Sequence, residues 1–192
     1  MTALFGVRLH GRGGQGVVTA AELLSVAGFL DGKQAQAFPS FGSERMGAPV
    51  AAYCRLADRP IRVREPVTEP DAVVVIDATL LHHVEVFAGL AGDGYVLINA
   101  SRPPADLGLA ELALRLPPER VVTVPATEIA RRQLGRPVPN VALLGAFAAL
   151  TGRVSRRSIE QAVRERFPAS VAAANVRAAR EAYAAVRVSA HA

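Results

Sequence analysis

The seven residues from 10 to 16, His-Gly-Arg-Gly-Gly-Gln-Gly, constrain the fold of this chain more than any other stretch. They lie between a short apolar run, residues 3–9, and an amphipathic run, residues 17–30, so a strand, a glycine loop and a helix are expected in that order. The glycines allow a tight turn and a close approach to another surface, and they leave the first amides of the helix pointing outward. The sequence therefore predicts an α/β unit with a polar helix N-terminus at the loop.

Three of these glycines match the dinucleotide-binding fingerprint G-x-G-x-x-G, which also needs an acidic residue at the end of the second strand to bind the ribose hydroxyls. Asp31 stands at about the right distance, but a glycine follows it, as at the end of a helix. The expected second strand, residues 34–38, is followed by Pro-Ser rather than by a carboxylate or an arginine. Three interpretations stay open: a dinucleotide site, a turn that only packs the helix on the strand, and a loop placed against a partner subunit or against an anion held by that partner.

Strand-like and helix-like segments alternate in the first half of the chain, and the second half is helical. Residues 71–76, Asp-Ala-Val-Val-Val-Ile, have the continuous β-branched run of a strand buried on both faces. Strands are expected at residues 3–9, 34–38, 49–56, 71–76, 95–99 and 120–125, and helices at 17–30, 79–90, 126–134, 141–150, 155 or 158 to 167, and 170–188. This order predicts a single three-layer α/β/α Rossmann-like domain over residues 1–192, with a mostly parallel sheet covered on both sides and a helical C-terminal part from about residue 126.

Composition narrows the class of protein. About half of the 192 residues are apolar and a fifth are charged, which is typical of a globular domain. The net charge of +5 comes almost entirely from arginine without interleaved aromatic residues, so we expect no nucleic-acid partner. Cys54 is the only cysteine; it cannot ligate an iron–sulfur cluster by itself and is expected to be a buried small hydrophobe. With neither a signal peptide nor an apolar run of ~18 residues, a cytoplasmic protein without a membrane partner is expected.

The chain offers few candidates for catalysis. His10 stands beside the glycine loop, where a structural or interface role is favoured because no nucleophile is paired with it. Asp77 ends a buried strand, a position typical both of functional residues and of helix caps. Asn140 is expected to be an N-cap. We predict no catalytic residue and no metal site in this chain.

The polar loop of residues 38–47 carries two phenylalanines, which a surface loop does not require. Phe38 and Phe41 are expected to anchor it and to leave Ser43, Glu44 and Arg45 projecting. A partly apolar surface of this kind is more often a contact surface than a catalytic one. The sequence therefore predicts a protein interface formed by Phe41, Ser43, Glu44 and Arg45.

Two motifs follow one another in the sequence: Gly11-x-Gly13-Gly14-Gln15-Gly16 and Pro39-Ser40-Phe41-Gly42-x-Glu44-Arg45-x-Gly47-Ala48-Pro49-Val50. In this order they resemble the gamma subunit of 2-oxoacid:ferredoxin oxidoreductases. The resemblance continues through Pro60-Ile61-Arg62, Pro70-Asp71 and residues 73–81, and more faintly through Asn140-x-x-x-Leu144-Gly145-Ala146 and Asn175-x-x-Ala178 with Tyr183. Two residues depart from the family pattern: Ala182 replaces a glycine, and Met46 stands where a second arginine is common.

The resemblance implies a subunit of an enzyme that oxidatively decarboxylates a 2-oxoacid on thiamine diphosphate with magnesium. Such enzymes pass electrons through 4Fe-4S clusters to ferredoxin and transfer the acyl group to coenzyme A. The implied partners are the alpha and beta subunits, which bind thiamine, and a ferredoxin-like delta subunit; this chain alone is expected to hold no cofactor and to be inactive. Pyruvate is the first substrate implied and a branched-chain 2-oxoacid the next, while an arylglyoxylate or indolepyruvate relative stays open.

The glycine loop is the candidate site for coenzyme A, for another anion or for a partner, because a helix N-terminus binds phosphate well and Arg12 adds a positive charge. Its residues are Gly11, Arg12, Gly13, Gly14, Gln15 and Gly16. Two alternatives remain for the whole chain. One is a free-standing NAD-dependent dehydrogenase that uses this loop, and the other is a non-catalytic regulatory module.

Overall fold

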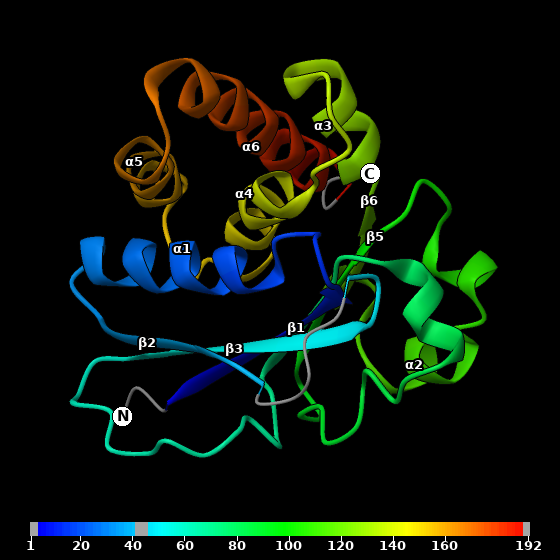
Figure 1. Cartoon of the computed structure of the whole chain (residues 1–192). Coiled ribbons are helices and arrows are strands. Elements are labelled where there is room, and N and C mark those ends of the chain that lie inside the picture. Colours follow the sequence, from blue (N-terminus) through cyan, green and yellow to red (C-terminus); the bar gives the residue numbers. More distant parts are fainter. Residues whose placement is uncertain (1–3, 41–45, 190–192) are drawn as a thin grey trace.

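The computed structural model describes residues 4–40 and 46–189. Within these residues, six strands form one sheet in the order β2-β3-β1-β4-β5-β6 (Figure 1). The strands are β1 (Phe5–Arg12), β2 (Gln34–Pro39), β3 (Pro49–Ala57), β4 (Ala72–Val75), β5 (Tyr95–Asn99) and β6 (Val121–Val124). β1, β4, β5 and β6 run parallel, whereas β3 is antiparallel to both of its neighbours. The mixed, mostly parallel sheet confirms the predicted fold class.

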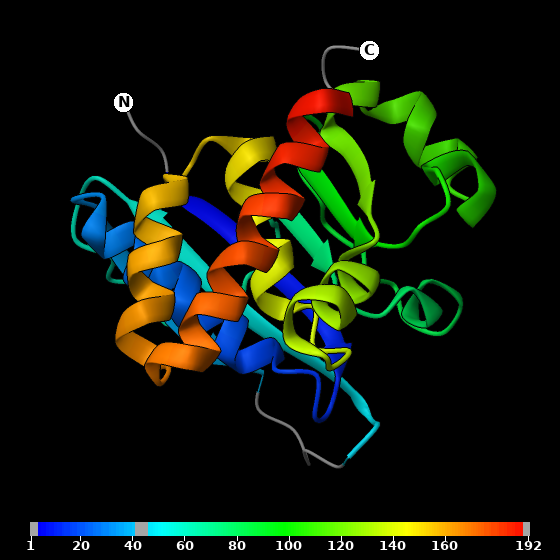
Figure 2. The same cartoon turned by 90° about the horizontal axis from the view of Figure 1, so that it is seen from above.

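The long helices gather on one face of this sheet, as Figures 1 and 2 show. They are α1 (Val17–Leu30), α3 (Ala126–Leu134), α4 (Asn140–Thr151), α5 (Arg156–Arg166) and α6 (Ala169–Ser189). The larger core lies between them and the sheet, with Leu9, Leu24 and Phe147 among its fully buried side chains. The helical C-terminal part thus covers one face of the sheet together with α1.

Short elements cover part of the other face. They are the 3-10 helices η1 (Ala78–His82), η2 (Pro104–Leu107) and η3 (Pro118–Arg120) and the helix α2 (Ala110–Arg115). Leu80 and Leu112 pack there against Val73, Val75 and Ile98 in a second, smaller core. This layer is thinner than the first because no long helix contributes to it among the described residues.

The predicted helix over residues 79–90 is wrong. Only η1 forms there, and Gly89 adopts a left-handed conformation with φ 70°. The apolar spacing imitates a helix, but the Val86 carbonyl oxygen, which would accept the amide of residue 90 in such a helix, accepts from the buried guanidinium of Arg8 instead. A tertiary contact therefore overrides the local pattern.

Helix α4 is buried on nearly all sides, because it lies between the sheet and α6. A Cβ atom on Gly145 would lie 2.0 Å from the carbonyl oxygen of Ala179 in α6, so only glycine fits at this crossing. The predicted boundaries of α3 are confirmed, with Gly135 as its left-handed C-cap. Ser155, rather than Ser158, is the N-cap of α5, since its side chain accepts a hydrogen bond from the Ser158 amide.

Cys54 is fully buried in the larger core, which confirms its predicted role as a small hydrophobe. Burial raises the pKa of its thiol, so the side chain stays protonated. In the part of the chain that the structure describes, no helix is both long enough and apolar enough to cross a membrane.

Candidate functional site

The glycine loop is shorter than the sequence indicated. β1 continues through Gly11 and Arg12, so the turn itself consists of residues 13–16. Gly14 (φ 92°) and Gly16 (φ 73°) adopt left-handed conformations that favour glycine. Gly16 N-caps α1, and its carbonyl oxygen accepts the Ala20 amide at 2.9 Å. Helix geometry leaves the preceding amides of residues 17–19 without an acceptor inside α1, so a polar helix N-terminus stands at the turn.

Gly11 has a packing role. A Cβ atom there would lie 2.6 Å from Val17 Cγ2 and 3.2 Å from Ile76 Cβ. The absence of a side chain thus allows α1 to approach β1 closely. The packing interpretation of the motif therefore holds for this glycine.

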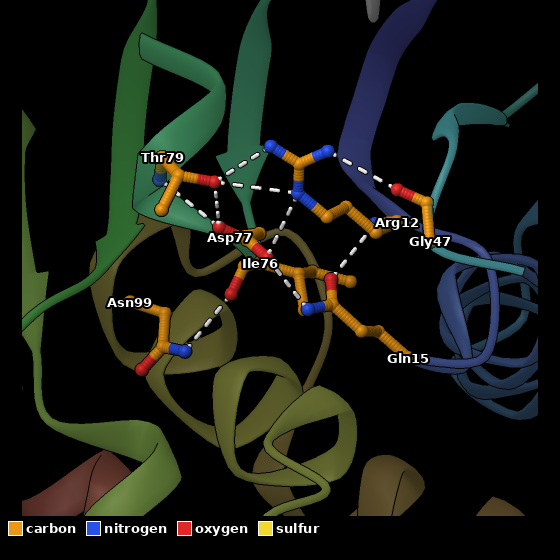
Figure 3. Close-up of polar contacts among 7 residues, drawn as sticks. All are labelled: Arg12, Gln15, Gly47, Ile76, Asp77, Thr79 and Asn99. Carbon is orange, nitrogen blue, oxygen red and sulfur yellow. Dashed lines mark hydrogen bonds and ion pairs between the residues drawn. The ribbon is translucent and has the colours of Figure 1, made fainter. Parts of the chain in front are cut away.

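The Arg12 side chain turns toward the ends of β3 and β4 (Figure 3). Its Nη1 donates to the Gly47 carbonyl oxygen at 3.1 Å, and its Nη2 and Nε donate to Thr79 Oγ1 at 2.9 and 3.3 Å. Its Nε also lies 3.4 Å from Asp77 Oδ2. Because 28% of the side chain is still exposed, the guanidinium is fixed in place and yet accessible.

Gln15 links the loop to the end of β4. Its Oε1 accepts the Arg12 amide at 2.8 Å, and its Nε2 donates to Asp77 Oδ2 at 2.7 Å. Burial opposes ionisation of Asp77, but hydrogen bonds from Thr79 and Gln15 and the charge of Arg12 outweigh it and hold the pKa of this carboxyl below its ordinary value. Asp77 also caps η1 by accepting the Thr79 amide at 3.0 Å, which confirms the predicted cap and adds a second role.

The two predicted motifs lie side by side. The Gly13 amide donates to the Ala48 carbonyl oxygen, and the Gly47 amide donates to the Gly13 carbonyl oxygen. Met46 forms an isolated bridge with Gly13 and is 88% exposed. Phe38 packs against the ring of Tyr53. The predicted interface residues Phe41, Ser43, Glu44 and Arg45 lie outside the described residues.

The position of Arg12, Gln15 and Asp77 in the sheet tests the interpretation of the loop as a dinucleotide site. α/β domains bind nucleotides outside the carboxyl ends of the strands, at the point where the strand order reverses. That point lies between β1 and β4, where the side chains of Arg12, Gln15 and Asp77 bond to one another. A cavity of about 330 Å³ lies beside them, and Gln15, Asp77 and Asn99 are among its lining residues.

The neighbours of β1 also differ from a dinucleotide fold. Antiparallel β3, starting at Pro49, takes the place beside β1 that a second parallel strand would need. Asp31 is the C-cap of α1 and accepts hydrogen bonds from Ser155 and Ser158, as its predicted place at a helix end suggests. The geometry therefore disfavours a dinucleotide site.

A cavity of about 480 Å³ lies on the other side of the loop, at the N-terminus of α1. Asn140 is the first residue of α4 rather than its predicted N-cap. Its Oδ1 accepts the Val141 amide at 2.9 Å, and its Nδ2 donates across to the Gly16 carbonyl oxygen at 3.3 Å. Arg136 stands on the far wall. The full lining is Gly14, Gly16, Thr19, Gln133, Leu134, Arg136, Val138, Asn140, Phe167, Ser170, Val171, Ala174 and Asn175.

His10 is buried and lies next to Arg8, whose Nε donates to His10 Nε2 at 3.1 Å. Burial and the charge of Arg8 lower the pKa of His10 to about 4, so the ring is neutral at pH 7. The predicted structural role is consistent with these contacts.

Comparisons with known proteins agree with this geometry. The family model "Pyruvate ferredoxin/flavodoxin oxidoreductase" matches residues 6–185. The "Pyruvate/ketoisovalerate oxidoreductases common subunit gamma" of Pyrococcus furiosus is 49% identical over 177 residues, which cover 92% of this chain and 94% of the relative. The chain belongs to this family, as a gamma-type subunit.

Two further proteins are similar to this chain over most of its length. The "Pyruvate synthase subunit PorC" of Methanosarcina barkeri is 51% identical over 158 residues, which cover 82% of this chain and 84% of the relative. The crystal structure of a pyruvate oxidoreductase subunit from Thermotoga maritima has a TM-score of 0.79 and 37% identity, covering 94% of this chain and 96% of that chain. The likeness thus extends over almost the whole fold.

Sequence reasoning missed two partners of the glycine loop in the gamma subunit. Thr79 belongs to no predicted site, whereas its hydroxyl contacts Arg12 from 67 positions away. The Asn140 contact with Gly16 spans 124 positions. The polar residue directly after the β4 run was the one available signal, because functional groups gather at strand ends.

Proposed function

We propose that this gamma subunit works in a multisubunit, thiamine-diphosphate-dependent 2-oxoacid:ferredoxin oxidoreductase, with pyruvate as its first substrate and a branched-chain 2-oxoacid next. The observation that carries the proposal is the 49% identity over 92% of the chain to a subunit whose name joins pyruvate and ketoisovalerate. Coenzyme A receives the acyl group and ferredoxin receives the electrons.

The chain's own residues fit a supporting role. Its single cysteine is buried, and a 4Fe-4S cluster needs four ligands. Among residues 4–40 and 46–189, no three His, Cys, Asp or Glu side chains gather as a metal site would require. The proposal assigns thiamine diphosphate, magnesium and the clusters to the alpha, beta and delta partners, and the isolated chain is expected to be inactive.

Anaerobic co-expression with candidate alpha, beta and delta subunits from the same genome tests this assignment. We expect a stable complex that reduces ferredoxin with pyruvate and coenzyme A, and more slowly with 2-oxoisovalerate. A gamma subunit that purifies alone from such cells, with no 2-oxoacid activity in any fraction, would contradict the proposal and favour the regulatory module. Micromolar NAD binding to the isolated chain in calorimetry would favour the dehydrogenase.

Within the complex, we propose that the glycine loop contacts coenzyme A. Coenzyme A brings several phosphate charges, and a helix N-terminus with an adjacent arginine is suited to bind them. Arg12 has five N–H donors, and its bonds to Thr79 and Gly47 use three of them among the described residues. The two that remain, one on each terminal nitrogen, match two oxygens of a phosphate.

The Arg12→Ala variant of the assembled enzyme tests this contact. We expect the KM for coenzyme A to rise about tenfold, because a hydrogen bond to a charged group contributes ~1.5 kcal/mol or more, while the KM for pyruvate stays unchanged. Arg59→Ala is the matched control. Arg59 is exposed after the end of β3, which pairs with the start of β1, whereas Arg12 lies at the other end of β1. Arg136→Ala probes the 480 Å³ cavity; a rise in the KM for coenzyme A with this variant, and none with Arg12→Ala, would contradict the Arg12 contact.

We also propose that residues 41–45 contact a partner subunit. The residues directly after this segment, 46–48, are tied to Gly13 and Arg12. The Arg45→Ala variant is expected to weaken assembly by about 2–5 kcal/mol if it removes one member of a buried charge pair, and to leave the isolated chain folded. Unchanged assembly and full activity would identify the segment as ordinary surface.

A further inference from the structure

The Thr79 hydroxyl joins the glycine loop to the end of β4 by three contacts (Figure 3). It accepts N–H groups from Arg12 Nη2 and Nε, and it donates to Asp77 Oδ1 at 2.6 Å. We propose that Thr79, supported by Asp77, is a positioning residue that holds the Arg12 guanidinium for a phosphate of coenzyme A. This inference rests on the proposed contact between the glycine loop and coenzyme A.

The direction of these hydrogen bonds follows from the charge of Asp77. An ionised carboxylate can only accept, and the pKa of Asp77 lies below its ordinary value. The hydroxyl hydrogen of Thr79 therefore points to Asp77, which leaves the lone pairs of Oγ1 to face Arg12. The contacts form a chain in which Arg12 donates to Thr79 and Thr79 donates to Asp77.

This series of hydrogen bonds fixes one side of the Arg12 guanidinium and leaves its other side available. Thr79 takes the edge that contains Nε, and the Gly47 carbonyl oxygen takes one hydrogen of Nη1. One N–H on each terminal nitrogen remains beyond the bonds to described residues, and this pair has the spacing of a bidentate phosphate contact. A guanidinium already held in one orientation loses less freedom when it binds an anion.

The hydroxyl is not needed for the local fold of η1. The cap is made by the Thr79 amide, which donates to Asp77 Oδ1 at 3.0 Å whatever the side chain is. The Thr79 side chain is exposed, so replacing it disturbs neither core. The contact with Arg12 is therefore separable from the cap, and a substitution can test it alone.

The test compares Thr79→Val, which keeps the shape and loses the hydroxyl, with Thr79→Ser, which keeps the hydroxyl. Coenzyme A is titrated into the anaerobic complex by calorimetry without 2-oxoacid, and steady-state constants are then measured. We expect Thr79→Val to weaken coenzyme A binding and to raise its KM about fivefold, with kcat and the KM for pyruvate unchanged. Thr79→Ser should stay within about twofold of the parent protein in every constant. So should the control Thr68→Val, whose exposed side chain precedes the amino end of β4, whereas Thr79 follows its carboxyl end.

A double variant separates this inference from the proposed function. If Thr79 acts through Arg12, Thr79→Val has no further effect on coenzyme A binding in the Arg12→Ala background. An effect of Arg12→Ala without one of Thr79→Val overturns the positioning role and leaves the coenzyme A contact standing. If Arg12→Ala itself has no effect, the proposed contact fails, and the inference fails with it.

Asp77→Asn is the second variant, in case Thr79→Val prevents assembly. It keeps the shape and a hydrogen-bond acceptor but removes the negative charge that directs the Thr79 hydroxyl. We expect coenzyme A binding to weaken about threefold, with the KM for pyruvate unchanged. Parent-like binding of coenzyme A by this variant would overturn the role of Asp77 in the proposal.

Discussion

Arg8 allows a direct test of how two loops, around residues 67–68 and 86–88, are held against the sheet. It stands on β1 and is only 8% exposed, and it faces the thinner layer of the molecule. Its guanidinium donates to the carbonyl oxygens of Val67 at 3.2 Å and Val86 at 3.1 Å, and it also reaches those of Thr68 and Ala88. One side chain thereby holds two separate loops against the sheet. We expect Arg8→Met, which preserves most of the volume, to destabilise the fold strongly.

The expected magnitude follows from the burial of the acceptors. Val67 and Val86 are buried, so their carbonyl oxygens lose a partner that water does not replace, at a cost of about 1–3 kcal/mol each. Thr68 and Ala88 are exposed, and water can hydrate their carbonyl oxygens. Burial lowers the pKa of the Arg8 guanidinium, which shows that the charge itself is costly to bury and that its removal returns part of the loss. We therefore expect a net loss of about 3 kcal/mol in the free energy of unfolding.

Urea unfolding of the full chain measures this loss. Helix circular dichroism is the suitable signal because the chain contains no tryptophan. Arg8→Lys keeps the charge, but its single nitrogen cannot reach both loops, so an intermediate loss of about 2 kcal/mol is expected. Arg59→Met is the surface control and should stay within about 0.5 kcal/mol of the parent chain. An Arg8→Met variant as stable as this control would refute the reasoning.

Three further predictions concern other buried groups. Because burial and the charge of Arg8 lower the pKa of His10 to about 4, the unfolded chain binds the proton first. Going from pH 7 to pH 5 should therefore cost about 2 kcal/mol of stability that His10→Gln does not lose, and equal losses in urea titrations would contradict this. Gly145→Ala should destabilise the chain by about 2 kcal/mol or more, because its Cβ would meet the carbonyl oxygen of Ala179, whereas Gly92→Ala in open space should be neutral in the same assay. Cys54 should react with iodoacetamide only after unfolding, since burial raises the pKa of its thiol, and rapid labelling of the native chain would disprove its burial.

Much of the fold could be predicted from local patterns. The apolar runs of β4 and β5 gave their positions because strands buried on both faces are continuous in sequence. Glycine and serine marked the end of α3 and the start of α5, since these residues satisfy helix termini by themselves. Such signals depend only on neighbours along the chain.

The errors arose where a distant partner decides the local structure. Residues 79–90 have helical spacing, but Arg8 takes the Val86 carbonyl oxygen that such a helix would use. Asn140 has the chemistry of a cap, but it contacts Gly16 across the domain. β1 extends two residues into the glycine motif because β3 pairs with it as far as Arg12 and Pro49. None of these partners can be read from neighbouring residues.

In the candidate site too, the residues could be predicted from their neighbours in the sequence, but the contacts between them could not. The glycine loop and Arg12 were found from their motif, and Asp77 from its place at a strand end. The network that joins them depends on side chains up to 67 positions apart. Sequence reasoning could therefore name the groups, but it could not tell that Arg12 is held by Thr79 and Gly47 rather than free.

The network fixes the glycine-rich loop through side chains of the protein itself. Gln15 Oε1 accepts the Arg12 amide from within the loop, and the Asp77 carboxylate lies beside the Arg12 guanidinium. The same residues support the backbone of Gly47, where the segment of residues 41–45 ends. Because the Arg12 side chain is still 28% exposed and two of its N–H groups remain beyond these contacts, we expect the surface at the ends of β1 and β4 to contact a ligand or a partner subunit.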